Sequence, residues 1–309
     1  MASPLERLSA GALGWLGRNL DHFDPFSASA GTSARGRAKA ALELALLCHC
    51  ADRPGGSPDA LDGATALVRK LWQHPDLPRL FDEDPAYTST YGLAFAALAP
   101  DGIDDTMCRD TLARLDPGFL SSPGRSAYRR IELRYYADKA GVRHAIEPYA
   151  ELVPLSPLVA LRAAGPGDTT GPDEAPLTTP EAYALTHTGF YLGDFGRTVP
   201  VLTGGERAHA EGLVDRMLGH CVAHDRWDLA AELVLTQYIL GSDPLRTPSG
   251  SAAVECLVRA QRPDGAVPGR SAALAAAPSA PPGEFFRKAY HTTLVTALMA
   301  LAVASPRPS

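Results

Sequence analysis

The chain has 309 residues, of which 45% are hydrophobic, and a formal net charge of -6 at pH 7. A chain of this length and hydrophobicity can bury a sizeable core. Because it has no basic block, its charge pattern excludes the electrostatic surface that a nucleic-acid-binding protein needs. It also has no run of eighteen apolar residues, and its start lacks the basic and apolar regions of a signal peptide. We therefore expect neither a nucleic-acid nor a membrane partner.

The cysteines are odd in number and irregularly spaced. This pattern indicates reduced thiols rather than a disulfide framework. Together with the lack of an export or membrane signal, it predicts a cytoplasmic protein. The cysteines are Cys48, Cys50, Cys108, Cys221 and Cys256.

Apolar residues recur with a helical period along nearly the whole chain, and no segment alternates as a strand would. Glycine and proline residues separate the periodic segments. We therefore predict an all-α fold in a single domain, residues 1–309. The predicted helices cover residues 3–19, 36–51, 58–74, 87–99, 104–115, 124–140, 156–163, 180–193, 205–223, 226–241, 249–261 and 289–303.

Two long segments rich in proline and glycine interrupt this pattern, near residues 164–178 and 266–284. Segments of this length and composition are either lids over a functional site or loose connections. Each precedes a helix that carries a candidate site residue. We expect both to be flexible.

Several predicted helices begin with polar residues and continue almost entirely apolar, which is typical of helices buried on all sides. They alternate with amphipathic helices that have one solvated face. This alternation predicts about six helical hairpins arranged as an inner and an outer ring, an α/α toroid, with an open α-solenoid as the alternative. The aligned helix starts place one position of each at the common centre: Thr88, His187, Asp228 and His291.

The segment "AYHTTLVTALMAL", from residue 289, resembles the last inner helix of protein prenyltransferase β subunits, and "QRPDG" resembles the turn of terpene-cyclase toroid repeats. The resemblance implies an α/α toroid and a zinc ligand at His291. The Asp-x-Cys ligand pair of the prenyltransferases has no counterpart, because "WDLAAEL" supplies Asp228 and Glu232 without a cysteine. This departure argues against prenyl transfer.

The C-terminal part of the chain, with "LTHTGFYLGDFG", "WDLAAELVL", "QRPDGAVPG" and "YHTTLV", also resembles a family of actinobacterial proteins found beside natural-product genes. That resemblance implies a common fold and a role in secondary metabolism. It brings no assigned reaction.

The candidate catalytic residues are His187, His291, Glu232 and Asp228. Imidazole and carboxylate groups bind zinc, iron or manganese, so His187, His291 and Asp228 are candidate ligands of a divalent metal. Without a metal, His291 paired with Glu232 would serve in acid–base chemistry. Asp228 near a helix start also suits a purely structural role at the helix dipole.

The candidate substrate-binding residues are Thr88, Tyr91, Tyr191 and Arg134. The first three are expected to line the centre of the ring, although core packing also explains tyrosines in apolar helices. Arg134 lies one turn from Arg130, and such a pair can clamp a carboxylate or phosphate. Pairing with neighbouring acidic residues is the structural alternative.

We expect a small-molecule enzyme of bacterial natural-product biosynthesis that is either metal-assisted or uses acid–base catalysis. Its substrate would be an apolar or peptide-like intermediate bound in the ring. The alternative is a non-catalytic binding or accessory protein for a biosynthetic partner protein. Fold alone does not choose between these functions.

Overall fold

The computed structural model describes residues 2–27, 34–52, 59–83, 87–121, 124–163, 175–270 and 282–305. These parts of the chain are helical and contain no strand, which confirms the all-α prediction. Within these described ranges the 3₁₀ helices are η1 (Asp59–Leu61), η2 (Pro78–Phe81), η3 (Val153–Leu155) and η4 (Asp194–Gly196). The α-helices are α1 (Pro4–Arg18), α2 (Leu20–Phe23), α3 (Ala34–Ala51), α4 (Asp62–Trp72), α5 (Thr88–Ala97), α6 (Thr106–Ala113), α7 (Pro117–Ser121), α8 (Ala127–Lys139), α9 (Tyr149–Leu152), α10 (Pro157–Ala160), α11 (Thr179–Leu192), α12 (Gly204–Ala223), α13 (Trp227–Leu240), α14 (Pro248–Ala260) and α15 (Pro282–Ala304).

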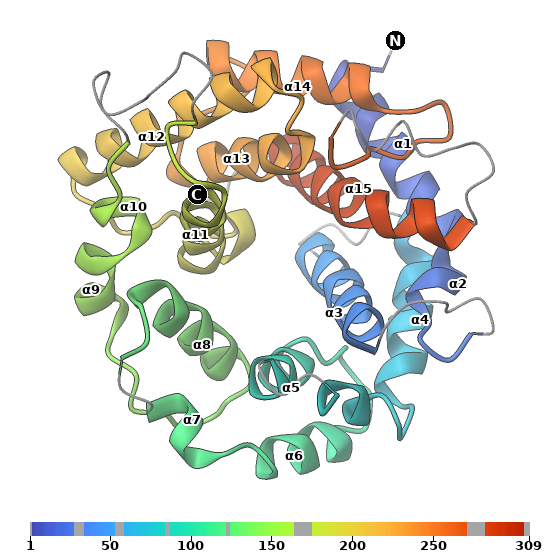
Figure 1. Ribbon diagram of the computed structural model, residues 1–309. Helices are drawn as coiled ribbons and strands as arrows, with labels where there is room; N and C mark the ends of the chain where they lie inside the picture. Colours follow the sequence, from blue (N-terminus) through green and yellow to red (C-terminus); the bar gives the residue numbers. More distant parts are fainter. Residues whose placement is uncertain are drawn as a thin grey trace.

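Six helices form an inner ring in the order α3, α5, α8, α11, α13 and α15 (Figure 1). Each contacts the next, and α15 contacts α3, so the ring is closed. Most of the remaining helices lie outside it, among them α4, α6, α12 and α14 (Figure 1). The first helix, α1, packs against the last, α15. The arrangement is that of an α/α toroid, whereas the two ends of an open solenoid would not meet.

Hydrophobicity explains which helices lie inside. In α13 every residue except Asp228 is buried, as expected for a helix surrounded by others. The outer helix α4 buries only one stripe, Ala64, Val68, Leu71 and Trp72, and exposes its charged face. Among the described residues, no helix is both long and apolar enough to cross a membrane.

The helices at the two loop segments differ from the sequence-based expectation. Helix α15 begins at Pro282, seven residues before the predicted start, while the segment predicted at 156–163 contains only the short α10. Most of the two expected flexible segments, residues 164–174 and 271–281, lies outside the described residues. At the edge of the second segment, Val267 is fully buried and bonds through its backbone to the Thr293 hydroxyl.

The "QRPDG" turn follows the end of α14 and packs against α1. Gly265 has a φ of +89°, and a Cβ atom there would lie 2.1 Å from the carbonyl oxygen of Gly11. The side chain of Gln261 donates to the carbonyl oxygens of Leu8 and Gly265, at 2.9 and 3.1 Å. The close backbone approach therefore requires glycine at 265 and helps to hold the first and last hairpins together.

Replacing Gly265 by alanine should destabilise the protein strongly, because the new methyl group meets backbone that cannot move aside. The positive φ alone costs about 1–3 kcal/mol, and the clash with Gly11 adds to it. Gly102→Ala is the matched control, since Gly102 also has a positive φ, +74°, but has no atom near its Cβ position. Urea denaturation of both variants measures the loss in the free energy of unfolding. Equal losses would show that the contact with Gly11 contributes nothing.

Candidate functional site

A cavity of about 490 Å³ occupies the centre of the ring, and all six inner helices contribute to its wall. Along several of these helices the lining residues change from polar to apolar. On α15, His291 is followed by Leu294 and Leu298, and on α5, Tyr91 is followed by Ala94. Since the outer helices return the chain, the inner helices run in the same direction. The cavity therefore has a polar end and an apolar end.

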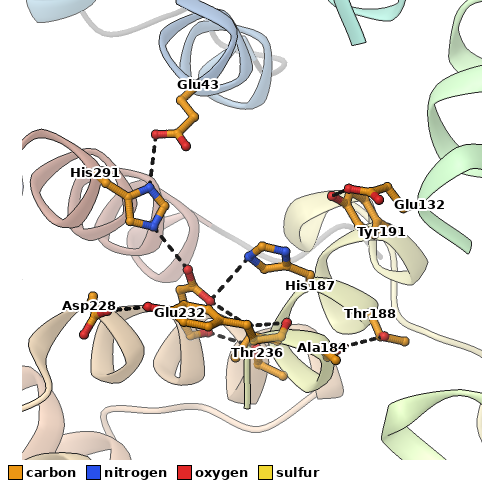
Figure 2. A network of polar contacts seen from close by, with 12 residues as sticks. Glu43, Glu132, Ala184, His187, Thr188, Tyr191, Asp228, Glu232, Thr236 and His291 are labelled. Atoms are coloured by element: carbon orange, nitrogen blue, oxygen red, sulfur yellow. Dashed lines mark hydrogen bonds and ion pairs between the residues drawn. The ribbon is translucent and has the colours of Figure 1, made fainter. Parts of the chain in front are cut away.

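The carboxylate of Glu232, on α13, is the centre of the polar end. It is buried and accepts a 2.6 Å hydrogen bond from the Thr186 hydroxyl at Oε2. Nε2 of His187 lies 3.7 Å from the same oxygen, and Nε2 of His291 lies 3.4 Å from Oε1 (Figure 2). Three residues predicted from the sequence thus converge from α11, α13 and α15.

Glu43 on α3 extends this group, and the sequence analysis did not find it. Its Oε2 lies 3.0 Å from Nδ1 of His291 (Figure 2). Its Oε1 lies 3.3 Å from Nζ of Lys39. Helix α3 was not among the aligned helix starts. The available signal was a single acid in the apolar run "AALELALL", four residues after Lys39.

Tyr128 lies at the other end of the group, with its hydroxyl 3.2 Å from Nδ1 of His187. A continuous chain of polar contacts thus runs across the cavity wall from α3 to α8. We call it the polar chain. Its members are Lys39, Glu43, His291, Glu232, His187 and Tyr128.

The charges in the polar chain stabilise one another. Burial disfavours the charged form of His291, but the carboxylates of Glu43 and Glu232 outweigh this effect and raise its pKa to about 10. Burial likewise disfavours the charge on Glu232, and the contacts with His187 and His291 nevertheless hold its pKa well below the usual value. The pKa of Glu43 is lowered against its burial by His291 and Lys39. At neutral pH, His291 is therefore a cation between two carboxylates.

A second polar cluster lines the cavity on α8 and α11. The hydroxyl of Tyr191 donates to Oε1 of Glu132 at 2.9 Å (Figure 2). Arg129 forms an ion pair with Oε2 of the same carboxylate. The face of α8 that lines the cavity carries Arg129, Glu132 and Tyr136, which are spaced three and four residues apart along the helix. Arg129 and Glu132 were not predicted as site residues.

Three predicted site residues do not line the cavity. Asp228 lies one turn before Glu232 on α13 and accepts a hydrogen bond from the Tyr183 hydroxyl (Figure 2). The alignment of helix starts was therefore offset by one turn on this helix. Thr88 donates to the carbonyl oxygen of Phe81. Arg134 lies on another face of α8 and donates to the carbonyl oxygens of Ile146 and Glu147. Tyr91 and Tyr191 do line the cavity.

The ligand set predicted for a divalent metal is not assembled. His187 and His291 face Glu232, whereas Asp228 is bonded to Tyr183. Within the parts of the chain that the structure describes, no group of three or more histidine, cysteine, aspartate or glutamate side chains is placed to hold a metal ion. Two imidazoles beside one carboxylate are groups that can transfer protons and form hydrogen bonds.

The ion pairs of His291 should make the protein less stable at alkaline pH than at neutral pH. Because the pKa of His291 is raised from 6.5 to about 10 in the folded protein, its stabilising contribution is complete below about pH 6.5 and is lost as the pH rises to about 10. The free energy of unfolding should therefore fall over this range. Urea denaturation of the wild type and His291→Gln measures it. The variant should lose less stability over the same range, and parallel curves would contradict the assigned charge.

Comparisons with known proteins identify a family but no characterised relative. Neither a curated protein nor a solved structure matches the chain significantly. One protein family, described as a domain of unknown function (DUF6895), matches residues 9–301. Because this match spans nearly all inner and outer helices, the chain belongs to the DUF6895 family.

Proposed function

We propose that the protein is an enzyme that performs acid–base chemistry on a small molecule held in the central cavity. The observation that carries the proposal is the convergence of two histidines on one buried carboxylate in the wall of that cavity. Histidine is the side chain best suited to proton transfer near neutral pH, and a carboxylate partner orients it. No step of this chemistry requires a bound metal.

His187 is the proposed catalytic residue. Its side chain is partly exposed in the cavity, with Glu232 near one ring nitrogen and the Tyr128 hydroxyl near the other. His187 would take a proton from the substrate directly or through Tyr128, and Glu232 would stabilise the resulting imidazolium. Glu232 is then a positioning residue.

His291 has a different proposed role from the one suggested by the sequence. A histidine with a pKa of about 10 is protonated at neutral pH and does not act as a base there. Its charge holds Glu232 ionised, so that Glu232 can in turn support a charged His187. The proposed acid–base pair is therefore His187 with Glu232.

The lining of the cavity is consistent with an amphiphilic or peptide-like substrate, because polar groups line one end and leucine and phenylalanine side chains line the other. The resemblance to proteins found beside natural-product genes supports a biosynthetic setting. None of the five cysteines, all of which lie in the part of the chain that the structure describes, forms a disulfide, which supports a reducing compartment such as the cytoplasm.

A non-catalytic binding or accessory role is the second candidate. It is favoured by the fact that both ring nitrogens of His291 and of His187 already have protein partners. Such a protein would hold a biosynthetic intermediate, or present it to a partner protein, without changing it. The two functions differ in whether a bound compound is converted.

Profiling by mass spectrometry distinguishes these functions without a known substrate. The purified full chain is incubated with a metabolite extract, and compounds that are consumed or retained are identified. We expect wild type to consume a compound that His187→Gln converts on the order of 10²-fold more slowly. His224→Gln is the matched control, since His224 is exposed and outside the cavity. Equal conversion by wild type and His187→Gln would contradict the proposed catalyst, and retention without conversion would favour the accessory role.

A further inference from the structure

The cavity exposes its cationic side chains and covers its carboxylates. The side chains of Lys39 and Arg129 are 47% and 36% exposed, whereas those of Glu43 and Glu132, their ion-pair partners, are 17% and 9% exposed. Glu232 is 1% exposed. The ammonium and guanidinium groups are therefore more accessible to a ligand than the carboxylates beside them.

These two cations have hydrogen-bond donors to offer. A lysine ammonium carries three donors and an arginine guanidinium five. Lys39 pairs with one oxygen of Glu43, and Arg129 with one oxygen of Glu132. Each ion pair therefore leaves further N–H groups on the same cation that the pair does not use.

Lys39 and Arg129 come from the two helices that flank α5 in the ring, α3 and α8. Between them lie the stacked rings of Tyr87 and Tyr91, whose centroids are 5.5 Å apart, and the Arg129 guanidinium lies 5.7 Å from the Tyr87 ring. All four side chains line the cavity. The two cations, with the tyrosine rings between them, thus form a cationic wall on the α5 side of the polar end.

We propose that this wall binds the head group of an amphiphilic monocarboxylate, whose apolar body occupies the apolar end of the cavity. Leu42, Leu46, Leu98, Leu294, Leu298 and Phe195 supply the apolar surface for the body. The inference names the ligand class of the site described under the proposed function, and rests on that function only in using the same cavity.

The charge balance of the lining residues limits how much charge a ligand can add. Among the described lining residues, the cations Lys39, Arg129 and His291 are matched by the acids Glu43, Glu132 and Glu232. A phosphate or diphosphate would bring two or more charges close to these partly desolvated acids and be repelled. An amine would face the exposed cations. A carboxylate matches the accessible donors and adds the least charge.

Four ligands with the same apolar tail test this inference on the unmodified protein: decanoate, 1-decanol, decylamine and decyl phosphate. Isothermal titration calorimetry measures their dissociation constants. We expect decanoate to bind most tightly, with the other three weaker by at least about tenfold. Equal or tighter binding of the alcohol, the amine or the phosphate would overturn the inference, and so would failure of decanoate to bind.

The variants Lys39→Gln and Arg129→Gln test whether the carboxylate of decanoate binds at these two side chains. Each substitution should weaken decanoate binding by about tenfold and leave binding of 1-decanol unchanged. The matched controls are Lys288→Gln and Arg79→Gln, which remove cations from surface ion pairs with Glu284 and Asp76 and should leave both ligands unaffected. Circular dichroism establishes that each variant folds. Unchanged decanoate binding in both cavity variants would contradict the assigned wall, while the ligand series holds even if a variant fails to fold.

Failure of this inference can be told apart from failure of the proposed function. If His187 is needed to convert a compound while decanoate fails to bind, the acid–base function stands and the carboxylate site falls. If decanoate binds through Lys39 and Arg129 while no compound is converted, the carboxylate site stands and the catalytic function falls.

Discussion

The buried carboxylate of Glu232 is the constraint on which the centre of this structure depends. It lies on the most completely buried helix of the ring, where an unpaired charge would be costly. Its compensation comes from Thr186 and His187 on α11 and from His291 on α15. The carboxylate is therefore tolerated only if three inner helices adopt their observed relative positions, so the packing of the ring and the geometry of the site are coupled.

Stability alone does not account for this arrangement. A buried ionic network usually contributes little to stability compared with apolar side chains of similar volume, because desolvation offsets the attraction between the charges. An all-apolar centre would satisfy the inner helices at least as well. The polar chain also lies in the wall of a cavity rather than in solid core, and its two ends, Lys39 and Tyr128, line that cavity. Both features are better explained by binding and proton transfer than by folding.

The sequence predicted the helices and part of the site because these depend on local patterns. Almost entirely apolar segments identified α13 and α15 as inner helices. Glu232 and His291 were found because they are polar residues within those segments. The alternation of buried and amphipathic helices predicted two layers of helices, in a closed toroid or an open solenoid, and the contact of α15 with α3 shows the closed form. These inferences need only hydrophobicity and helical periodicity.

The site residues that were predicted wrongly or missed depend on how the helices are placed relative to one another, which the sequence of a single helix does not determine. Asp228 and Glu232 share a face of α13, but one helical turn, about 5.4 Å, separates them along the axis, and only contact with α11 shows which meets His187. On α8 the rotation of the helix selects Arg129 rather than Arg134 for the cavity. Glu43 became a site residue only because ring closure brings α3 beside α15.

The most direct test of this account is the charge of His291, since the whole polar chain depends on it. Nitrogen-15 NMR of histidine-labelled protein, with His291→Gln used for assignment, reports whether each ring nitrogen carries a proton. The account predicts that both nitrogens of His291 are protonated at about pH 8, where an ordinary histidine is neutral, and that the ring titrates near its raised pKa of about 10. A neutral His291 ring at that pH would contradict the cation between Glu43 and Glu232, and with it the proposed organisation of the site.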